Sequence, residues 1–323
     1  MKKGFENFSD KLLNEIDSKR SFVVVGLDPE FEKIPFFSRE KLIKEHGFDL
    51  KAASETIVTF NKFLIDIAAP LVPAVKPQIA FYEMYGIEGI KAFSETVKYA
   101  KSKELIVIED AKRNDIGNTA RAYSIGHLGK VRLEEFAYKE VFGLDAITVN
   151  PYLGSDSIKP FLEDVKNYGK GIFVLVKTSN PSSIEIQDLI IKEGNKKLFE
   201  YVASLVNEWG SNFTGIRGYS AVGSVVGATF PEDAKVLRKI MPKSIFLVPG
   251  YGTQGGTGKD VVTCFNERDG YGAIISASRS INYPHGDNLG ISISSFEGLV
   301  RKSIDNMNND INDALRRKGM LPW

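Results

Sequence analysis

The sequence contains a single cysteine, Cys264, so no disulfide bond can form within the chain. A lone thiol is typical of proteins from a reducing compartment, and we expect a cytoplasmic protein. Residues 1–20 are basic but lack the apolar core that a secretory signal requires. No apolar run approaches the ~20 residues that a membrane-spanning helix needs, so we expect no membrane segment.

Neither sign of charge is in excess. The chain has 42 lysines and arginines against 41 aspartates and glutamates, which gives a formal net charge of +1 at pH 7. Binding to nucleic acid or to an anionic membrane surface relies on a basic excess or a basic patch. The composition therefore predicts neither kind of partner.

Residues that mark transition-metal sites are scarce as well. His46, His127 and His285 are the only histidines, and their spacing does not match that of metal ligands. There is no cluster of cysteine and histidine and no HExxH motif. We expect no transition metal, while a magnesium site built from acidic residues stays open.

Short apolar runs rich in β-branched residues are what the sequence does contain. Most of these runs are continuous rather than alternating, which is typical of parallel strands buried on both faces. They occupy residues 22–26, 72–75, 105–109, 146–149, 172–176, 220–227, 244–248 and 273–276. Helix-like segments separate them, at residues 54–68, 87–103, 155–166, 196–209 and 231–240. This alternation predicts a TIM barrel that forms one domain over residues 1–323, although a doubly wound open sheet has the same periodicity.

Further segments lie outside this alternation. An amphipathic helix is predicted before the first strand, and another helix is expected at the carboxyl terminus. The first rests on apolar residues at helical spacing, namely Phe5, Phe8, Leu12, Leu13 and Ile16. Residues 36–52 predict an extra helix on the barrel rim. Residues 179–195 predict a loop with a short helical piece, in a place where barrels keep the loops that close over substrates.

The third strand runs directly into charged residues. Asp110 and Lys112 are two positions apart, so their side chains share one face of the strand and should point into the barrel mouth. Asp115 follows in the loop, and Asn118 or Thr119 is expected to cap the next helix. Three charges of alternating sign at this spacing favour one another's ionised forms. Taken alone, this pattern fits an inert strand-end salt bridge as well as it fits a catalytic lysine.

The first two strands also end in charged residues. Asp28 follows the first strand and Lys76 follows the second. The carboxyl ends of all barrel strands meet at one face, where barrel enzymes keep their active sites. The charges at the ends of the first three strands together therefore predict an active site.

A glycine-rich segment follows the seventh strand. Its glycines Gly250, Gly252 and Gly255 spell G-x-G-x-x-G, but a dinucleotide fingerprint belongs in the first strand–helix turn of its fold. The same segment departs from a P-loop at two positions. Thr253 stands where the first glycine should be, and Asp260 stands where the magnesium-binding serine or threonine should be.

A site for a single phosphate is the better interpretation of this segment. Backbone N–H groups of the glycine-rich loop can bind the phosphate oxygens, and Gln254 adds a side-chain donor. Arg279 follows the eighth strand and can hold the phosphate with two hydrogen bonds. The loops after the seventh and eighth strands are the usual phosphate site of this fold. Glycine-rich turns beside a surface arginine are the alternative.

In chain order, these segments resemble the signature segments of the orotidine 5′-phosphate decarboxylase family, and the longer branch of it in particular. The matching segments are GLDP, AVKPQIAFYE, VIEDAKRNDIGNT, VKTSNP, PGYGTQGG and SRSI, within residues 22–284. The resemblance implies decarboxylation of orotidine 5′-monophosphate to uridine 5′-monophosphate (UMP), the last step of pyrimidine synthesis. It also implies that the reaction needs no metal and no cofactor.

The resemblance implies catalytic roles for several of the charged residues. Lys112 would donate a proton to C6 of the pyrimidine as carbon dioxide leaves. Asp110 would lie beside the departing carboxylate and, with Lys76, hold Lys112 in place. Asp115 and Thr119 would reach into the active site of a partner subunit, which would make a homodimer with shared active sites obligatory.

The remaining roles that the resemblance implies concern substrate binding. Asp28 would bind the ribose hydroxyls, and Ser179 would bind the pyrimidine edge. Gln254 and Arg279 would hold the phosphate. How the phosphate loop closes around Tyr251 is left open.

Two rival functions remain. One is a metal-dependent phosphosugar aldolase or epimerase on a related barrel, and the other is a protein that binds a phosphorylated ligand without reacting. The combination of Lys76, Asp110, Lys112 and Asp115 favours an enzyme, because simple binding has no need of a lysine between carboxylates.

Overall fold

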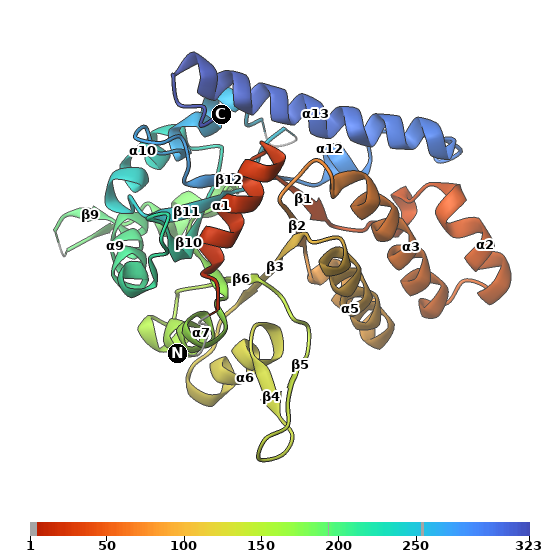
Figure 1. The fold of residues 1–323 in the computed structure, drawn as a ribbon, viewed down its shortest axis with the longest axis horizontal. Helices are drawn as coiled ribbons and strands as arrows, with labels where there is room; N and C mark the ends of the chain where they lie inside the picture. Colours follow the sequence, from red (N-terminus) through yellow and green to blue (C-terminus); the bar gives the residue numbers. More distant parts are fainter. Residues whose placement is uncertain (1–4, 193, 253–254) are drawn as a thin grey trace.

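Eight parallel strands close into a barrel in the computed structural model, which describes residues 5–192, 194–252 and 255–323 (Figure 1). Around the barrel the order is β1-β12-β11-β10-β7-β6-β3-β2, and β2 pairs with β1 to complete the circle. The strands are β1 (Val23–Leu27), β2 (Ala74–Pro77), β3 (Ile106–Arg113), β6 (Ala146–Val149), β7 (Gly171–Lys177), β10 (Ser220–Val226), β11 (Ser244–Val248) and β12 (Ala273–Ala277). The predicted strands and the TIM barrel are confirmed, and closure of the sheet rules out the open alternative.

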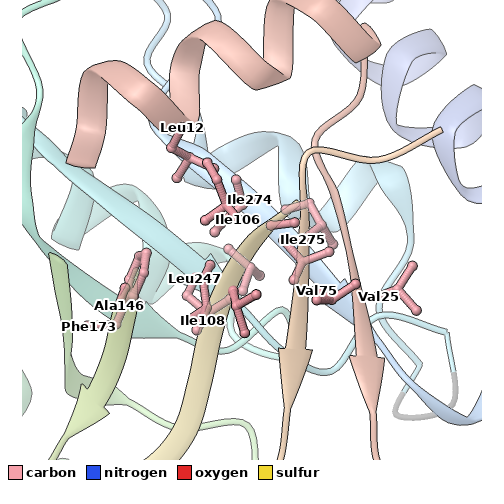
Figure 2. Close-up of a cluster of buried hydrophobic side chains, with 14 of the residues drawn as sticks. Leu12, Val25, Val75, Ile106, Ile108, Ala146, Phe173, Leu247, Ile274 and Ile275 are labelled. Atoms are coloured by element: carbon pink, nitrogen blue, oxygen red, sulfur yellow. The ribbon is translucent and has the colours of Figure 1, made fainter. Parts of the chain in front are cut away.

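Burial on both faces explains why the strands are apolar without alternation. Every residue of β1, β2, β6, β10, β11 and β12 is buried. One face of each strand fills the barrel and the other packs against helices. Side chains of four strands, Val25, Val75, Ile108 and Leu247, meet in one buried cluster (Figure 2). Burial declines toward the carboxyl end of β3, where the charged residues begin, and in β7 Leu175 alone is partly exposed.

Helix α1 (Phe8–Lys19) closes the amino end of the barrel. Its side chains contact residues that stand at or just before the starts of strands. The Ser9 hydroxyl donates to the carbonyl of Tyr219 (2.7 Å), and the Phe8 ring packs against Gly171. Leu12 points toward the barrel strands, above Ile106 and Ile274 (Figure 2). The predicted amphipathic helix is thus confirmed, and it leaves the opposite, carboxyl end of the barrel open.

Helices surround the barrel (Figure 1). They are α2 (Phe36–His46), α3 (Leu50–Ala68), α4 (Ala80–Glu83), α5 (Gly86–Ser102), α6 (Gly117–His127), α7 (Ser155–Tyr168), α8 (Ile184–Gln187), α9 (Leu198–Gly210), α10 (Pro231–Ile240), α11 (Gly258–Val261), α12 (Arg279–Asn282) and α13 (Ile293–Arg317). The five predicted helices between strands correspond to α3, α5, α7, α9 and α10, and α2 is the predicted rim helix. Helix α3 begins earlier than predicted because Asp49 caps it, accepting a hydrogen bond from the N–H of Ala52 (2.7 Å).

Two short hairpins were not predicted. The first, β4 (Lys130–Arg132) with β5 (Tyr138–Glu140), stands between α6 and β6 and projects from the barrel (Figure 1). The second pairs β8 (Ile190–Ile191), within the segment 179–195 that was predicted as a loop, with β9 (Lys196–Lys197), at the start of the predicted helix. Helix α8 is the short helical piece predicted in that loop. Helix α9 begins two residues after its predicted start because those residues form β9. Strands this short contain too few residues for a periodic signal.

The predicted cap of helix α6 is wrong. The chain turns at Gly117, which has a φ of +52°, so Asn118 and Thr119 already lie within the first helical turn. Ile116 occupies the capping position and makes no side-chain hydrogen bond there. A glycine with positive φ thus starts the helix where a polar side chain was expected.

Helix α13 is the predicted carboxyl-terminal helix. It packs along α3, α11 and β1, with a buried face that includes Phe296, Ile304 and Ile311. Its polar face is exposed. Across the parts of the chain that the structure describes, no helix combines the length and the apolar character needed to cross a membrane.

Replacing Asp10 with alanine is expected to lower the free energy of unfolding by about 2–4 kcal/mol. The buried Asp10 carboxylate accepts hydrogen bonds from the backbone N–H groups of Ile216 and Arg217, both at 2.9 Å, and so holds α1 beneath the barrel. Removing it leaves both donors without a partner. Urea denaturation measures the change. Asp313→Ala, which breaks an exposed pair with Arg316, is the control and should cost below about 0.5 kcal/mol. Equal midpoints for the two variants would contradict this account of α1.

Candidate active site

The charged residues at the ends of the first three strands come together at the open end of the barrel. Strands β1, β2 and β3 are consecutive neighbours, with Gly26 in register with Lys76 and Gln78 bridged to Asp110. This register brings the side chains of Asp28, Lys76 and Asp110 to one place. The prediction that these strand ends meet is confirmed.

Asp110 binds one lysine on each of its carboxylate oxygens. Lys76 Nζ lies 2.9 Å from Oδ2, and Lys112 Nζ lies 2.5 Å from Oδ1. The Lys76 side chain is 6% exposed and that of Asp110 is 13% exposed, whereas 45% of the Lys112 side chain is exposed. Lys76 is therefore buried in the protein interior, whereas Lys112 is exposed at the open end of the barrel.

The two lysines keep the buried carboxylate ionised. Burial by itself raises the pKa of Asp110, but the charges of Lys76 and Lys112 outweigh it and hold that pKa far below its usual range. Burial lowers the pKa of Lys76, and the charges of Asp110 and Asp28 reverse this and raise it. Each buried charge thus stabilises its neighbour.

Asp28 stands at the edge of this group. Burial raises the pKa of Asp28 above its usual value, opposed by the charge of Lys76 and by a hydrogen bond from Ser278. Its Oδ1 is buried and has no hydrogen-bond partner among the described residues. Gly26 makes room for this arrangement, since a Cβ there would lie 1.9 Å from Ser278 Oγ. A buried acceptor without a partner is available to a ligand hydroxyl.

Asp115 and Thr119 do not join the group within one chain. Asp115 accepts a hydrogen bond from the N–H of the next residue, Ile116 (2.8 Å), and forms no ion pair with any residue that the structure describes. Thr119 is exposed. Among the described residues, Lys112 therefore forms its ion pair with Asp110 and not with Asp115.

Two adjoining cavities open around Lys76 and Asp110. The first, of about 380 Å³, is also lined by Lys112, Thr148 and Ser179. The second, of about 250 Å³, has Asp28 and Arg279 in its wall. Pro249 belongs to both linings. The site is therefore elongated, with a charged group at the junction of its two halves.

Ser179 is held in the first cavity by a close backbone approach. A Cβ at Gly227 would lie 2.8 Å from Ser179 Cα, so only glycine fits there. Thr229 Oγ1 donates to the carbonyl of Ser179 (3.3 Å). Just before it in the chain, the fully buried Lys177 forms ion pairs with Asp188 and with Asp233, which fasten the segment that follows β7 to helix α10.

The glycine-rich loop borders the second cavity. Gly250, Gly252 and Gly255 have φ values of +95°, +72° and +92°, a region that favours glycine. Asp310 of α13 fixes the base of the loop, because its Oδ2 accepts from the Tyr251 hydroxyl (2.7 Å) and from the N–H of Gly258 (2.6 Å). Arg279 begins α12 beside this loop. The remaining predicted phosphate ligand, Gln254, lies outside the described residues.

Comparison with known proteins identifies the family. Residues 23–283 match the family model described as "Orotidine 5'-phosphate decarboxylase / HUMPS family". A Caldicellulosiruptor bescii protein named "Orotidine 5'-phosphate decarboxylase" is 42% identical over 96% of this chain and 99% of its own length. A protein of the same name from Rhodopirellula baltica is 44% identical over 86% of this chain and 89% of its own. The chain belongs to the orotidine 5′-phosphate decarboxylase family.

A solved structure supports this membership. The Leishmania donovani OMP decarboxylase is 30% identical, with a TM-score of 0.70 over 95% of this chain and 98% of its own. The similarity covers almost the whole chain. The resemblance noted from the motifs alone is confirmed at the level of the family. Within the described ranges, no group of three or more histidine, cysteine, aspartate or glutamate side chains has a metal-binding arrangement.

Two residues were not predicted from the sequence: Thr148, which lines the first cavity, and Asp310, which anchors the loop beside the second. Thr148 lies inside an apolar strand, and its only signal was one hydroxyl among aliphatic neighbours. Asp310 sits on an amphipathic helix where a polar residue is ordinary, so nothing in its surroundings marked it. The partners of both residues are remote in sequence, and only the fold brings them together.

Proposed function

We propose that this protein converts orotidine 5′-monophosphate into UMP and carbon dioxide, with Lys112 as the proton donor. The activity is that of its family, an orotidine 5′-phosphate decarboxylase, which is a carboxy-lyase of pyrimidine biosynthesis. The observation that supports the assignment of the site is the buried Asp110 with a lysine on each oxygen, at the junction of two cavities.

The chemistry needs a positive charge beside the reacting carbon. When the bond from C6 to the carboxylate breaks, its electron pair stays on C6, where the pyrimidine ring offers little resonance relief. The Lys112 ammonium stabilises this charge without rearrangement and then gives it a proton. The neutral lysine regains a proton from solvent. Asp110 and Lys76 keep the ammonium in position throughout.

The two cavities suit the two ends of the nucleotide. Ser179, in the first, would bind the edge of the pyrimidine. The unpartnered Asp28 oxygen, in the second, would accept a ribose hydroxyl, and Arg279 with Gln254 would bind the phosphate. Because the phosphate is remote from the bond that breaks, its binding energy is available to order the loops and to expel water.

Purified protein treated with EDTA should remain fully active on orotidine 5′-monophosphate. Lysine and aspartate side chains supply the charge and the proton, whereas a phosphosugar aldolase or epimerase of the rival kind depends on a divalent metal. The loss of the orotate chromophore, followed by ultraviolet absorbance, measures the reaction. An unchanged spectrum with the untreated protein would reject the activity, and activity lost with EDTA and restored by a divalent metal would reject the metal-free mechanism.

Lys112→Ala is the control for this assay, because it removes the proton donor while Lys76 keeps Asp110 paired. Turnover should disappear, whereas the Kd for UMP should change little. A residual kcat within about tenfold of the wild type, or ~1.4 kcal/mol, would exclude Lys112 as the donor.

Arg279→Ala should lower kcat/KM by about a hundredfold or more, since charge-assisted hydrogen bonds contribute roughly 1.5–3 kcal/mol each. The loss should shrink sharply for a substrate without the phosphate, because the deleted contact is then absent in any case. Steady-state kinetics on both substrates measure the difference. Arg301→Ala, on the outer face of α13, is the matched control and should change neither. Equal losses on both substrates would mean that Arg279 has a structural role.

We also propose a homodimer with shared active sites, in which Asp115 and Thr119 serve the partner subunit. Large apolar side chains are exposed after the carboxyl ends of three neighbouring strands, β2, β3 and β6. They are Met84, Ile116, Tyr152 and Leu153. Exposed apolar side chains on neighbouring loops beside an active site are typical of an interface. Asp115 lies next to one of these side chains, Ile116, and has no ion-pair partner among the described residues of its own chain.

Mixing two inactive variants, Lys112→Ala and Asp115→Ala, should restore about a quarter of the wild-type activity after subunit exchange. In a mixed dimer, Lys112 of one chain meets Asp115 of the other, so one of the two sites is intact. Random exchange makes about half of the dimers mixed. Exchange is verified by mass, and activity is followed over the same period. Complete exchange without recovery would exclude the shared site, because every site would then carry one defect.

Two further predictions rest on the sequence and the substrate. A phosphorylated nucleotide is charged and does not cross lipid unaided, so an enzyme that consumes it should be cytoplasmic.

We also propose that residues 1–323 form one domain. The close packing of both terminal helices on the barrel supports this organisation.

A further inference from the structure

The hydroxyl of Thr148 lies at the centre of the hydrogen bonding beside Asp110. Its Oγ1 is 3.0 Å from the N of Ala111, 2.9 Å from the N of Lys112 and 3.0 Å from Asp110 Oδ1. A backbone N–H can only donate, so the two N–H groups use the two lone pairs of the hydroxyl. Its single proton must then be donated to the carboxylate. Thr148 is 1% exposed, and every hydrogen-bonding position of its hydroxyl is occupied.

An irregularity in strand pairing creates the need for this hydroxyl. Strand β3 pairs with β6 at Glu109–Ile147 and resumes at Arg113–Val149, so residues 110–112 all stand opposite Thr148. The extra residues form a bulge. Two of its N–H groups, those of Ala111 and Lys112, donate to the side chain of Thr148.

The bulge also sets the direction of Lys112. This lysine has a φ of +48°, in the left-handed region that is unfavourable for residues other than glycine. The hydrogen bond from its own N–H to Thr148 helps to hold that conformation. From there the Lys112 side chain reaches Asp110 Oδ1, the same oxygen that accepts the proton of Thr148.

Strand formation does not explain a threonine here. The neighbours Ile147 and Val149 are aliphatic, and valine would fill the same buried volume with an equal preference for strands. What threonine adds over valine is the hydroxyl alone. The role of Thr148 therefore lies in the three hydrogen bonds that this hydroxyl makes.

We propose that Thr148 is a positioning residue for decarboxylation, which holds the β3 bulge so that Asp110 and Lys112 meet the reacting carbon in a fixed geometry. It transfers no proton itself. The proposal rests on the activity and on the proton donor proposed above. A rigidly placed ammonium stabilises charge in the transition state more than in the bound substrate, so the loss should fall on kcat.

Thr148→Val tests the proposal, because it removes the hydroxyl and keeps the shape. The kcat for orotidine 5′-monophosphate should fall by about 10–100-fold, while the Kd for UMP, measured by titration calorimetry, stays within about threefold. A merely structural role would weaken UMP binding and thermal stability along with kcat.

A second pair of variants keeps the test decisive if the valine variant fails to fold. Thr148→Ser and Thr148→Cys differ only in oxygen against sulfur, and a thiol is a weak donor and a weak acceptor. Thr148→Ser should keep kcat within about fivefold of the wild type, and Thr148→Cys should fall about as far as the valine variant.

Ser220→Ala is the matched control at the closed end of the barrel. The buried Ser220 hydroxyl donates to the carbonyl of Gly210 (2.8 Å) and accepts from the N–H of Val222 (3.1 Å). Its removal should lower thermal stability and leave kcat unchanged.

Three outcomes would overturn the proposal. They are a kcat for Thr148→Val within about threefold of the wild type, equal rates for the serine and cysteine variants, or losses in Ser220→Ala that match those in Thr148→Val. Failure of the wild-type protein to decarboxylate orotidine 5′-monophosphate would instead refute the proposed function.

Discussion

One buried carboxylate bound by two lysines is the interaction on which the active site depends. Burying a charge is costly unless an opposite charge and hydrogen bonds compensate for it, and Asp110 has both. Lys76 and Lys112 bind its two oxygens, and Thr148 donates a further hydrogen bond. Each of these partners compensates part of the buried charge of Asp110, and Lys76, the most deeply buried of the charged partners, keeps it paired inside the protein. The closed barrel makes this possible, because it brings adjacent strand ends to a fixed spacing.

The two ends of the barrel divide stability from function. At the amino end, α1 and the buried Arg238 tie the chain together, and Arg238 donates to the carbonyls of Met241, Ser244, Cys264 and Gly272. Burial lowers the pKa of Arg238 to about 10, which still leaves it charged near neutral pH. At the carboxyl end, by contrast, the charged residues Lys76, Asp110 and Lys112 line a cavity. Interactions at the amino end therefore stabilise the barrel, and the barrel in turn holds the active-site residues in place at its carboxyl end.

The segments that border the cavities are fastened at their bases. After β7, Lys177 connects to Asp188 and Asp233, and after β11, Asp310 holds both Tyr251 and Gly258. Lys177, Asp188, Asp233 and Asp310 do not line the two cavities, whereas Tyr251 lines the second. They fix where each segment leaves the barrel, which limits the conformations that the binding residues must give up when substrate binds.

The strands, the helices between them, the charged strand ends and the glycine-rich loop were all determined by the sequence itself. Each is a local pattern, because apolar periodicity reports burial and a charge at the end of a strand is visible from its neighbours. The family followed from the same motifs. Only the tertiary structure decided the bulge opposite Thr148, the anchor at Asp310, the start of α6 and the separation of Asp115 from Lys112. These depend on strand register and on which distant segments pack together, and the hydrogen-bond partners they bring into contact are remote in the chain. The hydroxyl of Thr148 in an apolar strand and the carboxylate of Asp310 on an amphipathic helix could not be assigned partners from the sequence, because their partners are distant in the chain.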